Sequence, residues 1–378
     1  MDILVNISSL QSPVTGIGRY TSQLLNCLIT DGNRLKGFDP LTNYDEIQLK
    51  NKLDALDSYT AQQKQNNKQI YYLKSIIKKL PFSYQARQVV QQLVNRPQFK
   101  KCKNYIYWEP NYILQPFDGV SVATVHDLSF IKYPQFHSKA MTSWLDKNLE
   151  KSIHTADALI TLSEFSKKEV VQHFSIPESK ITIVSPAVSS AFKAAISKET
   201  LKQLRQKYKL PENYILSVST LEPRKNLKTL LNAYARLPKK IKQSYPLVLV
   251  GAKGWGKEQN DFQSMINSGE VIILGYINQQ DIAGIYKASS LFMCLSLYEG
   301  YGMPVAEAMA SGVAVITSED SAMSEVSGQA AKLVNPLDVE QITDAMSYYL
   351  QENGARKQLA EKGRLHMQDS YWQQSADK

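Results

Sequence analysis

Two acidic side chains flank a short glycine-containing segment in the last third of the chain. Glu299 directly precedes Gly300, Tyr301 and Gly302, and Glu307 follows them. Glycines allow a chain backbone to approach a ligand closely, and carboxylates accept hydrogen bonds from hydroxyl groups. Carboxylates would repel a phosphate, so we expect sugar hydroxyls to be their partners.

The elements around this segment predict an anion site beside the carboxylates. The apolar run 291–295 predicts a buried strand, and Pro304 suits the first position of a helix that would hold Glu307 in its first turn. A strand, a glycine loop and a helix start direct free N–H groups and the helix dipole at the loop. A ligand with a diphosphate beside sugar hydroxyls is a nucleotide sugar, so the sequence predicts a nucleotide-sugar site here.

Each carboxylate also has a structural interpretation. Glu307 near a helix start could complement the dipole, which contributes about 0.3–1 kcal/mol. Glu299 could be a solvated loop residue. Their joint placement around the glycine loop favours the functional interpretation.

Two cations stand at a second predicted helix start. Arg224 and Lys225 follow Pro223 and precede a helix that begins near Asn226. The dipole end of a helix start is already positive, so two cations there are unfavourable unless an anion is bound. A diphosphate would satisfy them, with a forked contact from the guanidinium and a point charge from the ammonium. The alternative is an exposed basic loop.

Two sites in the first half of the chain also suggest a ligand. His126 follows the predicted strand 120–125 and could donate to a sugar hydroxyl or to the transferring phosphate, although a lone histidine can be structural. Gly16 and Gly18 follow the first predicted strand. Thr21 replaces the third glycine of the dinucleotide fingerprint, so we expect instead a tight turn that brings backbone against a ligand or the other domain.

Short apolar segments separated by helical ones predict parallel sheets covered on both faces. The predicted strands are 3–7, 120–125, 158–162, 181–184, 214–218, 247–250, 271–274, 291–295 and 314–316. Ser163 is the predicted cap of the helix that follows it. The polar, lysine-rich stretch 192–213 divides the chain into residues 1–192 and 193–364, with the tail 365–378 packing back on the first domain. Ligands bind beyond the carboxyl ends of such strands.

Length and composition describe a globular protein of two domains. The chain has 378 residues, of which 43% are hydrophobic and 21% charged. Its three cysteines have no metal-ligand spacing, and no cluster of His, Cys or acidic residues calls for a metal or another cofactor. With no signal peptide and no apolar run approaching ~18 residues, we expect a cytoplasmic protein.

The positive charge is concentrated in one segment. Residues 63–103 contain ten basic and no acidic residues, against a net charge of +9 for the whole chain. Apolar residues at helical spacing among lysines in 70–82 suit an anionic membrane surface. A solvated basic helix is the alternative. Nucleic acid is a poorer partner because no recognised nucleic-acid motif accompanies the segment.

These motifs together resemble the retaining GT-B glycosyltransferases of family 4, over nearly the whole chain. The branch that it is most similar to is mannosyltransferase-like and builds bacterial surface polysaccharides. The segments that support the resemblance are 15–20, 125–130, 163–167, 222–226 and 299–307.

The resemblance implies a GT-B fold of two doubly wound Rossmann-like domains that face each other across a cleft. It also implies a role for each site residue. Glu299 would hold hydroxyls of the donor sugar and Glu307 the ribose, while Arg224 and Lys225 would bind the diphosphate and His126 would reach the sugar from the other domain. The remaining predicted roles are sugar-pocket lining by Gly300, Tyr301 and Gly302, base contacts by Gly275, Tyr276 and Ile277, and contacts with phosphates or acceptor by Gly16 and Gly18.

The implied activity is that of a hexosyltransferase that retains the sugar's configuration. The expected donor is GDP-mannose, with UDP-glucose, UDP-galactose and dTDP-rhamnose as alternatives, and no cofactor is required. The expected acceptor is a saccharide or an undecaprenyl-linked saccharide at the inner face of the cytoplasmic membrane. A protein of this fold that binds sugar or lipid without catalysis is the second hypothesis.

Overall fold

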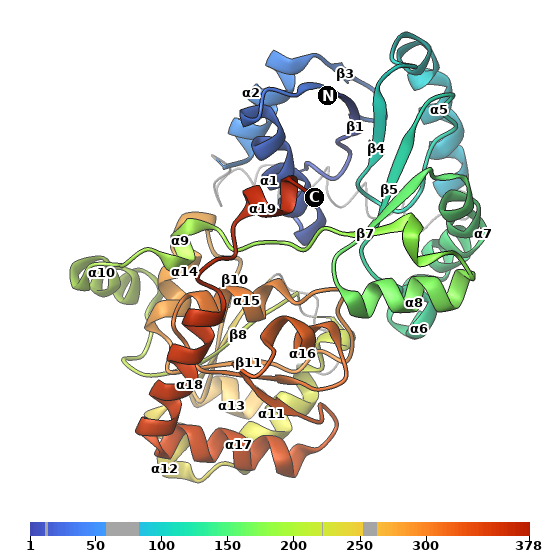
Figure 1. Ribbon diagram of the computed structural model, residues 1–378. Helices are drawn as coiled ribbons and strands as arrows, with labels where there is room; N and C mark the ends of the chain where they lie inside the picture. Colours follow the sequence, from blue (N-terminus) through green and yellow to red (C-terminus); the bar gives the residue numbers. More distant parts are fainter. Residues whose placement is uncertain (12–13, 58–82, 221, 252–262) are drawn as a thin grey trace. The chain divides into compact units, whose positions relative to one another are not determined.

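The chain forms two compact units, each built on its own sheet (Figure 1). The computed structural model describes residues 1–11, 14–57, 83–220, 222–251 and 263–378. Unit 1 comprises residues 1–186 and 372–378, and unit 2 comprises residues 187–371. The prediction of two Rossmann-like α/β domains is confirmed.

Unit 1 has a sheet that is parallel except at one edge. Its strands are β1 (Asp2–Asn6), β2 (Arg34–Phe38), β3 (Asn43–Tyr44), β4 (Ile106–Glu109), β5 (Ser121–Val125), β6 (Ala158–Thr161) and β7 (Ile181–Ile183). Its helices are α1 (Gly16–Thr30), α2 (Glu46–Asp57), α5 (Ser83–Lys101), α6 (Ser129–Lys132), α7 (Lys139–Thr155), α8 (Glu164–Phe174) and α19 (Trp372–Ala376), with short 3₁₀ turns η1 (Pro134–Phe136) and η2 (Glu178–Lys180). The strand order is β3-β2-β1-β4-β5-β6-β7, and only the β2–β3 pair of these described strands is antiparallel.

Unit 2 has a fully parallel sheet over its described strands. They are β8 (Ile215–Val218), β9 (Leu247–Val250), β10 (Val271–Gly275), β11 (Leu291–Cys294), β12 (Val315–Ser318) and β13 (Lys332–Val334). The helices are α9 (Ser190–Lys193), α10 (Lys198–Tyr208), α11 (Leu227–Arg236), α12 (Lys239–Ser244), α13 (Gln263–Asn267), α14 (Gln279–Ala288), α15 (Met303–Ala310), α16 (Ala322–Ser327), α17 (Val339–Gln351) and α18 (Asn353–His366), with the 3₁₀ turn η3 (Pro223–Lys225). The strand order is β10-β9-β8-β11-β12-β13.

Each sheet has one place where the order of its strands reverses. In unit 1 this switch point lies between β1 and β4, and in unit 2 it lies between β8 and β11. The helices that follow the two strands at such a point cover opposite faces of the sheet, which leaves a crevice at the carboxyl ends.

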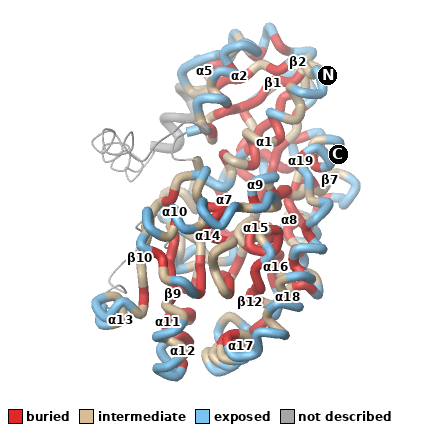
Figure 2. Tube along the Cα trace, turned by 90° about the vertical axis from the view of Figure 1, so that its left-hand side faces the viewer, coloured by how far each residue is buried: buried red, intermediate tan, exposed pale blue. Residues whose placement is uncertain are grey.

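The strands of unit 2 are apolar throughout because helices cover both faces of the sheet. Phe292 packs in one hydrophobic cluster, whereas its neighbours Leu291 and Met293 pack in the other. Figure 2 shows the strands in the buried interior and α10 and α12 largely exposed. Ser163 caps α8 as predicted, since its hydroxyl accepts from the Ser166 N–H at 3.1 Å.

The boundaries of the units follow from packing. Phe192 lies in the core of unit 2, so the chain enters unit 2 before the predicted boundary at residue 192. Trp372 contacts the Tyr20 ring of α1, and the Ser375 hydroxyl donates to the Ser185 carbonyl in unit 1. The tail that belongs to unit 1 thus begins at Trp372 and not at residue 365.

The basic segment 63–103 is described only in part. Its predicted amphipathic stretch, residues 70–82, lies outside the described residues. At its carboxyl end, Leu93 is exposed on α5, and Lys100 and Lys101 stand in the last turn. Within the described part of the chain, none of the helices combines the length and the apolar character that a membrane span requires.

Candidate active site

The switch point of unit 2 brings predicted site residues together. Arg224 and Lys225 lie in η3, after β8, and Glu299 lies in the loop after β11. These two strands are parallel neighbours, so both loops leave the same edge of the sheet. A backbone hydrogen bond of 2.9 Å from the Leu297 N–H to the Arg224 carbonyl joins the loops.

Glu299 pairs with both predicted cations. Its carboxylate accepts from Arg224 Nη1 at 3.1 Å and from Lys225 Nζ, and all three side chains are largely buried. Arg224 Nη1 also donates to the Tyr298 carbonyl at 2.7 Å. Burial alone would raise the pKa of Glu299, but the charges of Lys225 and Arg224 outweigh it and lower the pKa to about 2. Glu299 is therefore ionised, and the three side chains together carry one net positive charge.

This pairing corrects one expectation. The sequence predicts that only a bound anion balances the two cations at the helix start, but Glu299 already neutralises part of their charge. Arg224 Nη2 also lies 3.7 Å from the more exposed carboxylate of Glu222, so the two cations suit an anionic ligand that takes the place of these carboxylates.

Asn226 fixes the turn that directly follows the two cations, although the sequence predicts for it no role beyond a helix start. It adopts a left-handed conformation with φ of 56°, which asparagine tolerates, and this turn separates η3 from α11. Its side chain donates to the Pro336 carbonyl at 2.7 Å and accepts from the Thr229 hydroxyl at 2.6 Å. Only its position directly after the two cations could have indicated this role.

The glycine loop leads into α15 through a conformation that requires glycine. Gly302 has φ of 99°, and a Cβ there would lie 2.6 Å from Met323 Cγ. Because α15 begins at Met303, Glu307 lies in the second turn and not in the first, which corrects the prediction. Glu307 is buried and accepts a hydrogen bond from the Tyr286 hydroxyl at 3.0 Å.

The other residues predicted for the sugar and the base lie in loops of unit 2. Gly275 ends β10 with φ of 70°, and its carbonyl accepts from the Gly251 N–H at 2.9 Å. Ile277 is buried in the core, so its side chain is used in packing, while Tyr276 is half-buried.

The residues predicted to line the sugar pocket include Tyr301. Burial, and then the charge of Glu325, raises the pKa of Tyr301 to about 12. Gly300 precedes Tyr301 in the loop after β11.

His126 follows β5 in unit 1 and is almost fully buried. Its Nε2 lies 2.6 Å from the Pro110 carbonyl, which can only accept, so Nε2 bears the proton. Burial lowers the pKa of the ring, although the Pro110 carbonyl and the charge of Asp127 act in the opposite direction. In a neutral ring whose Nε2–H donates to the Pro110 carbonyl, Nδ1 has no proton and can accept a hydrogen bond. In this tautomer Nδ1 accepts and does not donate, so the predicted donation by His126 would need a second proton on the ring and stays a prediction.

The two glycines at the start of α1 differ. A Cβ on Gly18 would lie 2.6 Å from the Ser9 carbonyl oxygen, so packing within unit 1 requires this glycine. A Cβ on Gly16 would have no neighbour within 4 Å. Of the two, only Gly16 has space beside it for a ligand.

Two family models match the chain. The model described as Glycosyltransferase Family 4 matches residues 14–192, and the one described as Glycosyl transferases group 1 matches residues 200–366. The chain is also 31% identical to O-antigen chain mannosyltransferase B of Escherichia coli, over 99% of this chain and 97% of that one. The chain belongs to glycosyltransferase family 4.

Solved structures agree with the GT-B fold of this glycosyltransferase. Sucrose-phosphate synthase from Thermosynechococcus elongatus superimposes with a TM-score of 0.73 at 18% identity, covering 100% of this chain and 96% of that one. WaaG, a glycosyltransferase involved in lipopolysaccharide biosynthesis, superimposes with a TM-score of 0.71 at 12% identity, covering 100% and 98%.

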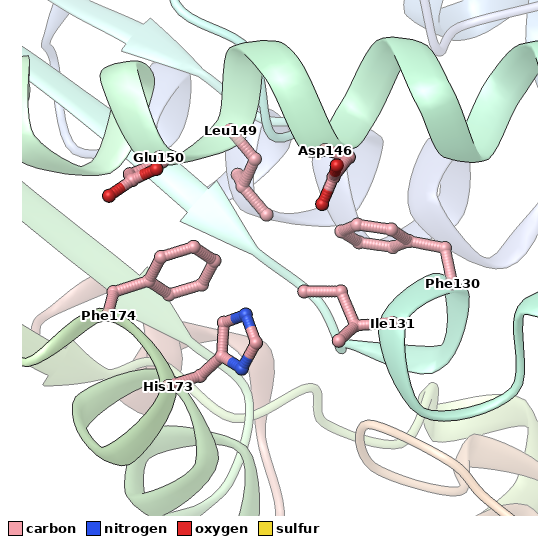
Figure 3. A pocket seen from close by; sticks show the side chains of 7 residues that line it. All are labelled: Phe130, Ile131, Asp146, Leu149, Glu150, His173 and Phe174. Carbon is pink, nitrogen blue, oxygen red and sulfur yellow. The ribbon is translucent and has the colours of Figure 1, made fainter.

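A separate cavity in unit 1 of the glycosyltransferase lies outside the predicted site (Figure 3). It is lined by Phe130, Ile131, Asp146, Leu149, Glu150, His173 and Phe174, from α6, α7 and α8 and has a volume of about 110 Å³. Ligand pockets typically measure about 300–1,000 Å³, so this cavity is too small for a nucleotide sugar. Across the described ranges, no three His, Cys, Asp or Glu side chains are grouped to hold a metal ion.

Proposed function

We propose that this glycosyltransferase transfers a mannosyl group from GDP-mannose to a saccharide acceptor in the synthesis of a surface polysaccharide, with retention of configuration. The observation that supports it most is the full-length similarity to O-antigen chain mannosyltransferase B. A serotype-specific mannosyltransferase, WbdA of Escherichia coli, is also 32% identical over 54% of this chain, which corresponds to 26% of its own length.

In this proposal the charged cluster of unit 2 holds the donor. Arg224 and Lys225 bind the diphosphate, Glu299 accepts from the sugar hydroxyls, and Glu307 accepts from the ribose. The bond between the anomeric carbon and the β-phosphate oxygen breaks, and the two cations stabilise the charge that develops on the leaving diphosphate. The acceptor oxygen attacks from the same face, and its proton passes to the leaving phosphate.

The acceptor is a lipid-linked saccharide in this proposal, bound at an anionic membrane surface through segment 63–103. The support is the concentration of ten basic residues there and the exposure of Leu93 beside them. Sedimentation with vesicles of phosphatidylglycerol and phosphatidylcholine tests it. Binding should fall as the anionic lipid is removed or as salt is raised. Equal binding to neutral vesicles would contradict the proposal.

A panel of nucleotide sugars tests the donor. GDP-mannose should raise the melting temperature and release GDP in the presence of acceptor, whereas UDP-glucose, UDP-galactose and dTDP-rhamnose should not. UDP-glucose is included because Anabaena HepE, which has the same fold at a TM-score of 0.69 and 15% identity over 100% of this chain and 97% of its own, was solved with UDP-glucose. Release of another nucleotide would refute GDP-mannose, and binding without any release would favour the non-catalytic hypothesis.

A further inference from the structure

A buried carboxylate lies at the switch point of unit 1 and is absent from the predicted site. Glu109 ends β4 and Asn6 ends β1, the two strands between which the sheet order reverses. Glu109 is 2% exposed. Its Oε2 accepts from Asn6 Nδ2 and from the Tyr107 hydroxyl, both at 2.7 Å. These neutral donors fix the carboxylate but do not neutralise it.

One peptide group connects this carboxylate to His126. The Asn111 N–H donates to Glu109 Oε1 at 3.2 Å. The carbonyl of the same peptide group, that of Pro110, accepts from His126 Nε2 at 2.6 Å. A carboxylate on the N–H end of an amide draws charge toward the carbonyl end, because successive hydrogen bonds polarise one another. The Pro110 carbonyl thus becomes a stronger acceptor for the imidazole.

The surroundings of His126 leave a single atom for a ligand. The ring makes edge contacts with Tyr20 and Tyr112, at centroid distances of 5.5 and 5.8 Å. With Nε2 bonded to Pro110, Nδ1 has no hydrogen-bond partner within the described part of the chain. A neutral imidazole nitrogen without a proton accepts hydrogen bonds from hydroxyl groups.

We propose that Glu109 is a positioning residue, which acts through the Pro110–Asn111 peptide group to hold His126 in its Nε2–H form with Nδ1 directed to a substrate hydroxyl. This rests on the proposed function, since it requires a hydroxyl-bearing substrate at unit 1. A carboxylate that orients a histidine through a hydrogen bond to its far nitrogen is a common arrangement in functional sites. Here the peptide group lies between them.

Burial gives the Glu109 network a dependence on pH. Burial raises the pKa of Glu109 to about 7, although bonds from Asn6, Tyr107 and the Asn111 N–H lower it. The titratable groups that face this network are Tyr107, whose pKa burial and then Glu109 raise, and His126 with Asp127 beside it. Protonation of Glu109 weakens its hold on the peptide, so the Nε2–H form should lose population as pH falls through 7.

Nitrogen-15 NMR of histidine-labelled protein tests the inference without any substrate. The His126 signals are assigned by comparison with His126→Ala. The full-length wild type should show a protonated Nε2 and an unprotonated Nδ1 at pH 8. Glu109→Gln removes the charged acceptor from the Asn111 N–H and so weakens the Pro110 carbonyl as an acceptor. The Nε2–H form should therefore lose population relative to the wild type, although the Pro110 carbonyl still accepts from it. An unchanged tautomer in Glu109→Gln would overturn the inference, whether or not the protein transfers mannose.

Asp157→Asn is the matched control. Asp157 also accepts from a backbone N–H, that of Ser121 at 2.8 Å, but at the opposite end of β5. This variant should lower the melting temperature without changing the His126 tautomer. A tautomer change in Asp157→Asn like that in Glu109→Gln would overturn the inference, because it would show a general response to destabilisation.

A double-mutant cycle separates positioning from stability. Glu109→Gln should lower kcat about tenfold in the wild-type background, as loss of groups that orient a functional histidine does. In the His126→Ala background it should have no further effect, because the residue through which Glu109 acts is already gone. Additive losses would refute the positioning role.

Discussion

The two units each have a carboxylate at the switch point of the sheet, and the pKa values of these two carboxylates are shifted in opposite directions. Glu299 lies in the loop after β11 of unit 2, and Glu109 ends β4 of unit 1, so both stand at the carboxyl edge of parallel strands. The pKa of Glu299 is lowered to about 2 because Lys225 and Arg224 outweigh its burial, whereas burial raises the pKa of Glu109 to about 7 among neutral donors. Two largely enclosed carboxylates with different neighbours thus have opposite shifts.

The difference indicates a different ligand chemistry for each unit. The unit 2 switch point has paired charges of both signs, cations that suit a diphosphate and a carboxylate that suits hydroxyl groups. The unit 1 switch point presents a neutral imidazole, held by hydrogen bonds. We therefore expect charge-changing substitutions to reduce activity more in unit 2.

Lys225→Ala should produce the largest effect, a loss of a hundredfold or more in kcat, since one electrostatic donor to the leaving group is removed. Steady-state transfer from GDP-mannose measures it. Lys242→Ala is the control, because Lys242 on α12 is similarly buried and pairs at 3.2 Å with Glu270, which directly precedes β10. Near-normal transfer by Lys225→Ala would contradict the expectation that charge-changing substitutions reduce activity more in unit 2.

Glu299→Gln should weaken binding of the donor sugar without weakening binding of the diphosphate. Its amide keeps the shape but loses the charged hydrogen bond to hydroxyls, so the affinity for GDP-mannose should fall about tenfold to a hundredfold. GDP should bind at least as tightly, because a negative charge beside its phosphates is gone. Calorimetric titration with both ligands measures this. Equal weakening of both would show that Glu299 does not distinguish the sugar.

Gly302→Ala should destabilise unit 2 by about 2 kcal/mol or more. The added Cβ would meet Met323 Cγ at 2.6 Å in a left-handed conformation. Gly16→Ala in unit 1 is the contrast, since no atom lies within 4 Å of its Cβ. Thermal unfolding should show a lower melting temperature only for Gly302→Ala. If Gly16 approaches a ligand as predicted, Gly16→Ala should lose activity without losing stability.

The pH dependence of stability should show the smallest effect. Between pH 5 and 8 it contains opposite contributions from Glu109 and from His126, whose pKa burial lowers, so the Glu109 contribution is measured against Glu109→Gln. The pKa of Glu109 is raised in the folded protein, so the folded state binds a proton that the unfolded state releases, and this contribution to stability rises as pH falls from 7 toward 4.5. Relative to Glu109→Gln, the wild type should gain several degrees in melting temperature from pH 8 to 5.

Glu299 should behave in the opposite way. Its lowered pKa contributes stability that is complete above about 4.5 and is lost only as pH falls toward 2. The difference in melting temperature between wild type and Glu299→Gln should therefore stay constant from pH 8 to 5. If this melting-temperature difference changed from pH 8 to 5 as much as the one for Glu109→Gln, the opposite pKa shifts of the two carboxylates would be contradicted.

The sequence predicts the parts of the fold whose local pattern is strong. Strands such as β9 and β11 are continuously apolar because both faces are covered, and the sequence predicts them within a residue of each end. Among the described residues, β2, β3, β4 and β13 lie outside the predicted set. Their sequences mix charged, aromatic and glycine residues, so only pairing with neighbouring strands in the folded sheet identifies them.

The site residues of unit 2 could be proposed from local spacing, but their contacts could not. Glu299 and Lys225 are 74 positions apart, and only the neighbouring strands β8 and β11 bring them together. Glu109 had no local signal, because an acid at the end of an unpredicted strand resembles a surface residue. Its connection to His126 depends on one peptide group that only the folded chain positions.

The structure of the protein with GDP-mannose bound tests the central claim most directly. We predict diphosphate oxygens within hydrogen-bond distance of Arg224 and Lys225, and Glu299 turned to a hydroxyl of the mannose. A nucleotide bound elsewhere, with Glu299 still paired to both cations, would contradict the account.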